Sequence, residues 1–169
     1  AGVLADIKTI SRFGCFGVAA VTSLTLQNTQ GVFGAYHQGA EAVKEQMRVL
    51  FDDFEISAIK IGMLPSREVV EAVADLIRVA AVPHIVVDPV VRSTSGFDLI
   101  EDDSLHAIVE HLLPLASVVT PNAAEAEKMS GHPVRDKADM QRAARQILAM
   151  GPRAVLLTGG DMEGESATD

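Results

Sequence analysis

Apolar residues along this chain of 169 residues follow two alternating patterns. Short runs of β-branched and aliphatic residues, typical of strands buried on both faces of a sheet, occur at 18–26, 58–64, 85–91, 117–120 and 154–157. Between these runs, apolar residues recur every three or four positions, as on the buried side of an amphipathic helix, at 43–54, 69–77, 105–112 and 140–148. Strands that alternate with helices predict one α/β domain over residues 1–169, with a doubly wound, mostly parallel sheet and helices on both faces.

Local signals agree with these boundaries. Gly2 precedes a helical stretch that carries Asp6, and Ser66 is followed by acidic residues typical of a first helical turn. Residues 30–39 break the regularity, because glycines interrupt an aromatic and polar stretch there. Two interpretations of that segment stay open. It is either an ordinary surface connection, or a loop or small edge strand that lies over a site or contacts another subunit.

The composition is ordinary for a globular protein and argues against some classes of function. The net charge of -9 and the pI near 4.9 disfavour nucleic-acid binding, which needs a basic stripe. No apolar stretch reaches the roughly 18 residues of a membrane-spanning helix, and no signal peptide is visible. The single cysteine, Cys15, cannot form an intramolecular disulfide, so we expect a cytoplasmic protein in which Cys15 is buried. The chain starts without methionine and stops at Asp169 without a closing helix or strand, so both ends look cut.

Two of the strand runs end in polar residues that suit phosphate chemistry. Asp88 directly follows an apolar run, while Asn122 and Glu125 occupy the turn after the next run. In an open α/β sheet, ligands bind beyond the carboxyl ends of the strands, and carboxylates there can hold Mg²⁺. A plainer interpretation makes Asp88 a turn cap and pairs Asn122 with Glu125 in a helix capping box. For Asn122 and Glu125 the two roles are compatible.

Other candidate contacts are weaker when taken one at a time. Gly159 and Gly160 follow a strand run and would let a nucleotide approach the backbone closely. Gln27 could hydrogen-bond the edge of a heterocycle while Met63 packs on its face, but plain turn and core roles are as well supported. Residues 93–96 form a hydroxyl-rich turn that suits either a phosphate or an ordinary loop. The sequence contains no Walker A, GxGxxG, GxSxG or CxxC motif.

Five short segments, taken in order, resemble the hydroxymethylpyrimidine/phosphomethylpyrimidine kinases of thiamine biosynthesis, which belong to the ribokinase-like superfamily. They are Ala1-Gly2-x-x-Ala5-Asp6-x-Lys8-Thr9, Gln27-Asn28-Thr29-x-Gly31-Val32, Lys60-Ile61-Gly62-Met63-Leu64, Asp88-Pro89-Val90 with Ser95-Gly96, and Thr120-Pro121-Asn122-x-x-Glu125-Ala126. The resemblance covers essentially the whole chain. It implies a ribokinase-like fold and an ATP- and Mg²⁺-dependent enzyme that phosphorylates 4-amino-5-hydroxymethyl-2-methylpyrimidine and then its monophosphate.

The resemblance also implies which residues form the site. Residues that match the pyrimidine pocket are Asp6, Gln27, Met63 and Val90, with Ala1 and Gly2 at its rim. Residues that match the nucleotide side are Asn122, Thr158 and Gly160 for ATP, and Asp88 and Glu125 for Mg²⁺. The mechanism implied is in-line attack by the substrate hydroxyl, helped by positioning and charge neutralisation. We also expect a homodimer.

The sequence departs from the family pattern in two places. Thr158-Gly159-Gly160-Asp161 stands where the family usually has a Lys-Gly-Gly-His-like sequence, which removes a cation near the ATP phosphates. The family's Gly-Thr-Gly-Cys/Asp segment, which carries the catalytic base at a helix N-terminus, would lie beyond Asp169, and the first strand before Ala1. We therefore assign no base within this chain and expect it to be inactive alone. Two alternatives stay open: a pyridoxal kinase, and a non-catalytic pyrimidine- or nucleotide-binding module.

Overall fold

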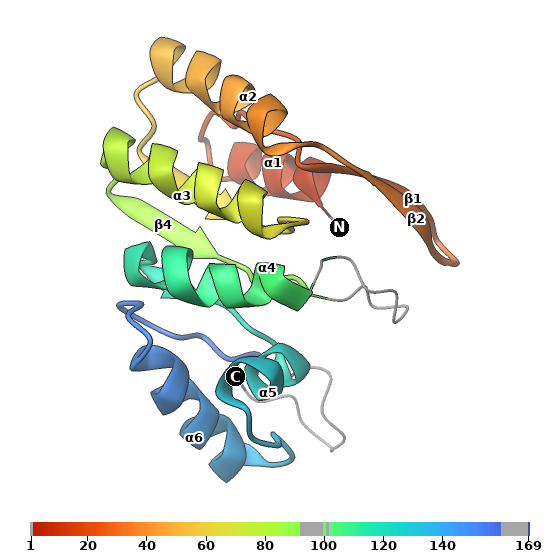
Figure 1. Cartoon of the computed structure of the whole chain (residues 1–169), viewed down its shortest axis with the longest axis vertical. Coiled ribbons are helices and arrows are strands. Elements are labelled where there is room, and N and C mark those ends of the chain that lie inside the picture. Colours follow the sequence, from red (N-terminus) through yellow and green to blue (C-terminus); the bar gives the residue numbers. More distant parts are fainter. Residues whose placement is uncertain (1, 92–99, 101, 160–168) are drawn as a thin grey trace.

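The computed structural model describes residues 2–91, 100, 102–159 and 169 (Figure 1). Its helices are α1 (Val3–Arg12), α2 (Ala40–Asp53), α3 (Arg67–Ala80), α4 (Asp102–Ala107), α5 (Ala123–Ser130) and α6 (Lys137–Leu148). After α4 the chain continues through a π-helical turn, η1 (Ile108–Leu112), and a 3₁₀ turn, η2 (Leu113–Leu115). The strands are β1 (Ser23–Asn28), β2 (Gly31–His37), β3 (Ala58–Ile61), β4 (His84–Val87) and β5 (Val118–Val119).

A parallel sheet in the order β3-β4-β5 forms the centre of the fold. Residues 154–158 extend it beyond β5, because parallel bridges join Val119 to Val155 and Asn122 to Thr158. Each strand pairs with the one that precedes it along the chain, so their carboxyl ends meet at one edge. The predicted runs at 58–64, 85–91, 117–120 and 154–157 all contain these paired residues, and the mostly parallel sheet is confirmed.

Side chains alternate between the two faces of this sheet. Ile61, Val87 and Val119 lie side by side in the ladder and are each 5% exposed or less. They face a buried cluster to which α2, α3, η1 and α6 contribute, and α2, α3 and α4 run side by side over it (Figure 1). Lys60, one position before Ile61, points to the opposite face, where it bonds to Asp6 of α1. Helices therefore cover both faces, as predicted.

The sequence of α3 shows why a helix forms and which side it buries. Its apolar residues recur at helical spacing and form one buried stripe, made of Val69, Val70, Val73, Ala74 and Ile77. Charged residues occupy the other side, where Arg67 pairs with Glu71 four positions later at 3.1 Å. The helix ends at Ala81, which takes a left-handed conformation with φ 50°. The predicted helical stretches at 43–54 and 140–148 likewise correspond to α2 and α6.

The first apolar run behaves differently from the others. The prediction that 18–26 forms a strand of the parallel sheet is wrong, because β1 begins only at Ser23 and pairs antiparallel with β2. A tight turn explains the change: the Asn28 side chain accepts hydrogen bonds from the Gln30 and Gly31 amides at 2.8 and 3.3 Å. The resulting hairpin projects away from the helices (Figure 1). The segment 30–39 is thus largely a strand of this hairpin rather than a loop.

Cys15 is exposed, which contradicts the expected burial. The chain leaves α1 through Gly14, whose φ of 77° lies in the left-handed region. Phe13 and Phe16, on either side of this turn, are each 81% exposed, so the whole turn lies at the surface. The sequence neighbours of Cys15, a glycine and an aromatic residue, therefore do not indicate that this cysteine is buried.

Candidate functional site

The polar residues that follow the parallel strands lie at one edge of the sheet. Asp88 comes directly after β4, and its amide donates a hydrogen bond to the Ile61 carbonyl of β3 at 2.8 Å. The Thr120 amide, after β5, donates to the Val87 carbonyl of β4 at 2.9 Å. The hydrogen-bond ladder thus continues past the strand ends. Because of this continuity, the turns that carry Asp88 and Asn122 leave the sheet at neighbouring positions.

A lysine joins two of the predicted carboxylates at this edge. Lys60 Nζ lies 3.2 Å from Asp6 Oδ2 and 3.1 Å from Asp88 Oδ2. The three side chains are each about a third exposed. Burial acts to lower the pKa of Lys60, but hydrogen bonds to Asp88 and Asp6 outweigh it and raise this pKa above its ordinary value. Lys60 therefore carries a full positive charge between the two carboxylates at neutral pH.

Lys60 belongs to one of the segments that carry the family resemblance, but the sequence alone assigns it no role. The signal was present in the strand Ala58-Ile59-Lys60-Ile61. A lysine between two isoleucines, next to a strand end, has to leave the buried face because residues alternate sides. Its long chain then reaches the edge at which the other polar residues gather.

Asn122 and Glu125 form a second cluster on the next turn. Asn122 Oδ1 accepts a hydrogen bond from the Glu125 amide, and Glu125 Oε2 accepts one from the Asn122 amide, both at 2.9 Å. This is a complete capping box at the start of α5, as one interpretation of the sequence predicted. Thr158 lies beside it, because Thr158 bridges to Asn122 and donates its amide to the Pro121 carbonyl at 2.9 Å.

Residues predicted for the pyrimidine pocket are placed around the ends of β3 and β4. Met63 is half-buried after β3, and its carbonyl accepts a hydrogen bond from Thr22 Oγ1 at 2.7 Å. Val90 is half-buried after β4, and its amide donates to the Asp88 carbonyl at 2.8 Å. Gly2 caps the N-terminus of α1 with φ 73° and is exposed. The three elements that carry or precede these residues, α1, β3 and β4, are joined by the ion pairs of Lys60 with Asp6 and Asp88.

Other predicted residues are not joined to these clusters. Gln27 is exposed on β1, opposite Val32 of β2, and its place in a pyrimidine pocket stays a prediction. Ala1, Gly160 and the hydroxyl-rich segment 93–96 fall outside the described residues.

The donor set at this edge fits Mg²⁺. Enzymes commonly hold Mg²⁺ with one or two carboxylates, water and the phosphates of the substrate. Asp88 and Glu125 supply carboxylates on neighbouring turns, and a hydrogen bond from the Asn122 amide holds the buried Glu125 carboxylate in place. In the described ranges, no group of three or more His, Cys, Asp or Glu is arranged to hold a metal ion without such help.

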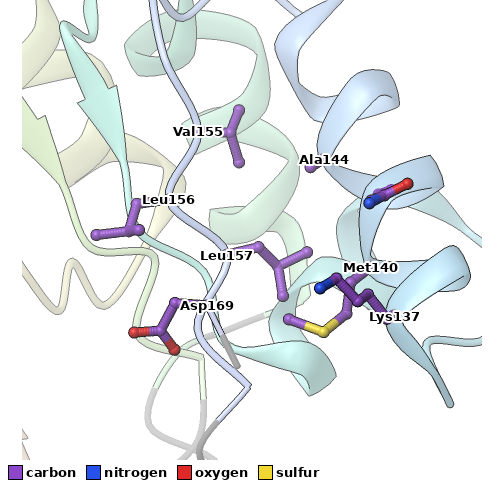
Figure 2. Close-up of a pocket in the computed structure, with 8 residues that line it drawn as sticks. Lys137, Met140, Ala144, Val155, Leu156, Leu157 and Asp169 are labelled. Carbon is purple, nitrogen blue, oxygen red and sulfur yellow. The ribbon is translucent and has the colours of Figure 1, made fainter. Parts of the chain in front are cut away.

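A hollow of about 290 Å³ lies elsewhere, between α6 and the strand segment 154–158 (Figure 2). Leu157 and Met140 point toward each other across it, while Leu156 points to the other side of the strand. The hollow is open and mainly apolar, and none of the predicted site residues lines it. It therefore adds no chemistry to the polar edge.

Comparisons with known proteins agree on one family. A family model described as phosphomethylpyrimidine kinase matches residues 1–169. A hydroxymethylpyrimidine/phosphomethylpyrimidine kinase of Rhizobium meliloti is 45% identical over the whole chain, which spans 64% of that relative's length. The crystal structure of a phosphomethylpyrimidine kinase from Clostridium difficile is similar with a TM-score of 0.88 and 37% identity, covering 98% of this chain and 72% of that one.

A second group of similar structures consists of pyridoxal kinases. The ADP complex of Bacillus subtilis pyridoxal kinase has a TM-score of 0.86 at 30% identity and covers 99% of this chain and 63% of that one. The fold is therefore shared with two kinds of vitamin kinase, whereas the sequence identity of this chain is higher to the phosphomethylpyrimidine kinases than to the pyridoxal kinases. No helix among the described residues is long and apolar enough to cross a membrane.

Proposed function

The chain belongs to the phosphomethylpyrimidine kinase family, and we propose that the intact protein transfers phosphate from ATP to 4-amino-5-hydroxymethyl-2-methylpyrimidine and then to its monophosphate. The observation that carries the proposal is the pairing of two polar clusters at one sheet edge. One contains Asp6, Lys60 and Asp88, and the other contains Asn122 and Glu125. Phosphoryl transfer depends mainly on positioning and charge neutralisation, which such clusters supply.

The first cluster and the residues near it are proposed to hold the pyrimidine. Asp6 offers a carboxylate that can accept hydrogen bonds from the exocyclic amine, and Met63 and Val90 offer apolar surface for the ring. Gly2, with Ala1, is assigned to the rim, where a glycine leaves room for the ligand. Gln27 is assigned a hydrogen bond to the edge of the ring. This division places the substrate hydroxymethyl group toward Asp88.

The second cluster is proposed to face the phosphates of ATP. Asn122, Thr158 and Gly160 are assigned to the nucleotide, while Asp88 and Glu125 would hold Mg²⁺. When bound, Mg²⁺ neutralises charge on the transferring phosphate. Asp88 and Glu125 would hold the ion near the pyrimidine hydroxyl, and the capping box holds the Glu125 side chain in place. We assign no general base among the described residues.

One assay tests the proposal. The intact protein is offered the pyrimidine, its monophosphate and pyridoxal in parallel, with ATP and Mg²⁺, and ADP release is measured. We expect kcat/KM for both pyrimidines to exceed that for pyridoxal by about tenfold or more, a ratio that a few pocket contacts provide. A preference for pyridoxal would assign the protein to the other vitamin kinase. No ADP release with any of them would favour a binding module.

A homodimer is also part of the proposal. The hairpin exposes several large apolar side chains, namely Leu24, Leu26, Phe33 and Tyr36. Exposed apolar residues gathered on a projecting element are typical of a protein–protein interface. Light scattering during size-exclusion chromatography measures the mass directly, and we expect Leu24→Asp to convert a dimer to a monomer.

We also propose that the protein is located in the cytoplasm, because an unpaired cysteine stays reduced there.

A further inference from the structure

Lys60 connects two parts of the molecule that are far apart in the sequence. Its ammonium lies 3.2 Å from a carboxylate oxygen of Asp6 in α1 and 3.1 Å from one of Asp88 after β4. Both distances permit charge-assisted hydrogen bonds, which are stronger and more directional than bonds between neutral groups. A single ammonium therefore fixes two carboxylates relative to each other.

These two carboxylates have different assignments in the proposed function. Asp6 belongs to the pyrimidine side and Asp88 to the Mg²⁺ side. We propose that Lys60 is a positioning residue that holds Asp6 in the pyrimidine pocket and at the same time competes with the cation at Asp88, so that one ammonium couples the two halves of the site. This inference rests on the proposed function, because it concerns how the two halves of that site are held together.

The backbone next to Lys60 is adapted to this arrangement. A Cβ placed on Gly62 would lie 3.3 Å from Lys60 Nζ, which is closer than an ordinary van der Waals contact. The glycine therefore leaves the space that the ammonium occupies. Because no left-handed φ is recorded for Gly62, alanine there disturbs the ammonium without straining the backbone.

Removal of the ammonium has opposite effects on the two sides. Asp6 loses the partner that holds its carboxylate in place, so pyrimidine binding weakens. Asp88 loses a nearby positive charge that competes with a cation, so less Mg²⁺ is needed for half-maximal activity. A residue with a purely structural role would weaken both or neither. The opposite signs are therefore the signature of the proposed role.

The test uses the intact protein with Lys60→Met and Lys60→Arg. Lys44→Met is a matched control, because Lys44 has a similarly exposed side chain and pairs with Glu41 on the surface of α2. Calorimetry measures the pyrimidine Kd without ATP or Mg²⁺, and the kinetic assay measures the Mg²⁺ concentration at half-maximal rate. We expect Lys60→Met to raise the pyrimidine Kd by about three- to tenfold, as for a partly exposed charged hydrogen bond, and to lower the half-saturating Mg²⁺ concentration. Lys60→Arg should restore part of the pyrimidine affinity, and Lys44→Met should match the wild type.

A second variant covers the case in which Lys60→Met does not fold. A Cβ at Gly62 presses on the ammonium, which has to move by a few tenths of an ångström, so Gly62→Ala should shift both measurements in the same directions by a smaller factor. Unchanged values in the folded Lys60→Met protein, or in Gly62→Ala if the former is unfolded, would overturn the positioning role. Lack of pyrimidine phosphorylation by the wild type would instead overturn the proposed function, so the two failures are distinguishable.

Discussion

The carboxylate of Glu125 has a structural task in addition to its proposed one. It completes the capping box of α5 by accepting a hydrogen bond from the Asn122 amide. The side chain is nearly buried, so its conformation is fixed before any ligand binds. A ligand-binding oxygen held in this way costs little entropy to use. Because the same side chain caps α5, deleting it would combine a loss of helix stability with a loss of the proposed metal contact.

The substitution Glu125→Gln separates the capping role of Glu125 from its proposed metal-binding role. Glutamine keeps an oxygen that accepts the Asn122 amide, so we expect the melting temperature to stay close to that of the wild type. The charge is lost, so kcat should fall by at least about tenfold, since a metal contact is worth several kcal/mol, and the Mg²⁺ response should weaken. Glu125→Ala should add a loss of about 1 kcal/mol from the cap. An unchanged Mg²⁺ response in the glutamine variant would leave Glu125 with the cap alone.

Gln27 allows a test of the pyrimidine side. Its side chain is exposed on β1, so Gln27→Leu should leave the fold intact. If its amide binds the ring edge, the variant should raise KM for the pyrimidine by about tenfold, the value of one or two lost hydrogen bonds, while KM for ATP stays the same. Steady-state kinetics with each substrate varied in turn provides the measurement. Equal changes in both KM values would argue against the assignment.

At the scale of the elements, two helices end in the same left-handed geometry with different residues. α5 ends at Gly131 with φ 73°, whereas α3 ends at Ala81 with φ 50°. Glycine adopts this region without steric cost, but a residue with a Cβ does not. One of the two caps is therefore relaxed and the other strained.

Exchanging the residue types should give effects of opposite sign. We expect Gly131→Ala to lower the free energy of unfolding by about 1 kcal/mol and Ala81→Gly to raise it by a similar amount. Urea denaturation followed by circular dichroism measures both. Each variant is the control for the other, because both positions are helix ends at the surface. Destabilisation by both would mean that left-handed strain is not the deciding factor.

A charged cluster fixes α3 against α4 and η1. Arg67 Nε lies 2.7 Å from Asp103 Oδ2, and its Nη1 lies 3.3 Å from Glu110 Oε2. The hydrogen bond from Arg67 holds the pKa of Asp103 below its ordinary value of 3.8. A carboxyl group with a lowered pKa in the folded state stabilises the fold above its unfolded pKa, and loses that contribution as the pH falls through the folded value.

Asp103→Asn should therefore lower stability at pH 7, while its difference from the wild type should shrink as the pH falls well below about 4. The pair is exposed, so the effect at neutral pH is small and decreases with added salt. Urea midpoints measured across this pH range check the prediction, with Asp53→Asn at the end of α2 as a control. A difference that is the same at every pH would exclude the ion pair as its cause.

At the scale of the whole molecule, the sequence predicted the elements better than their pairing. The amphipathic patterns of α2 and α6 have a period that only a helix satisfies, and the runs around β3 and β4 have the length of buried strands. The run 18–26 looks similar, but its partner is set by the turn at Asn28 rather than by its own composition. The role of Lys60 depends on which side chains it meets, and these can be identified only when the register of the sheet is known.

Hydrogen exchange should follow the same architecture. β4 is paired on both sides, by β3 and β5, and two of its residues are 5% exposed or less. The β1–β2 hairpin has two strands and large exposed side chains, and isolated hairpins are marginally stable. We expect amides of β4 to exchange slowest and, in the monomeric Leu24→Asp variant, those of the hairpin to exchange much faster, as measured by mass spectrometry. Equal protection of β4 and the hairpin in that monomer would contradict the prediction.

The strand order has a consequence for synthesis on the ribosome. β3, β4, β5 and the segment 154–158 lie in the sheet in the order in which they are translated. Each new strand can therefore dock on the strand made just before it, and each closure spans only the helices between two successive strands, α3 for the first closure and α5 with α6 for the last. From β3 onward the sheet grows in one direction, because each new strand is added to the strand before it. In this part of the chain, no early strand has to wait for a distant late one.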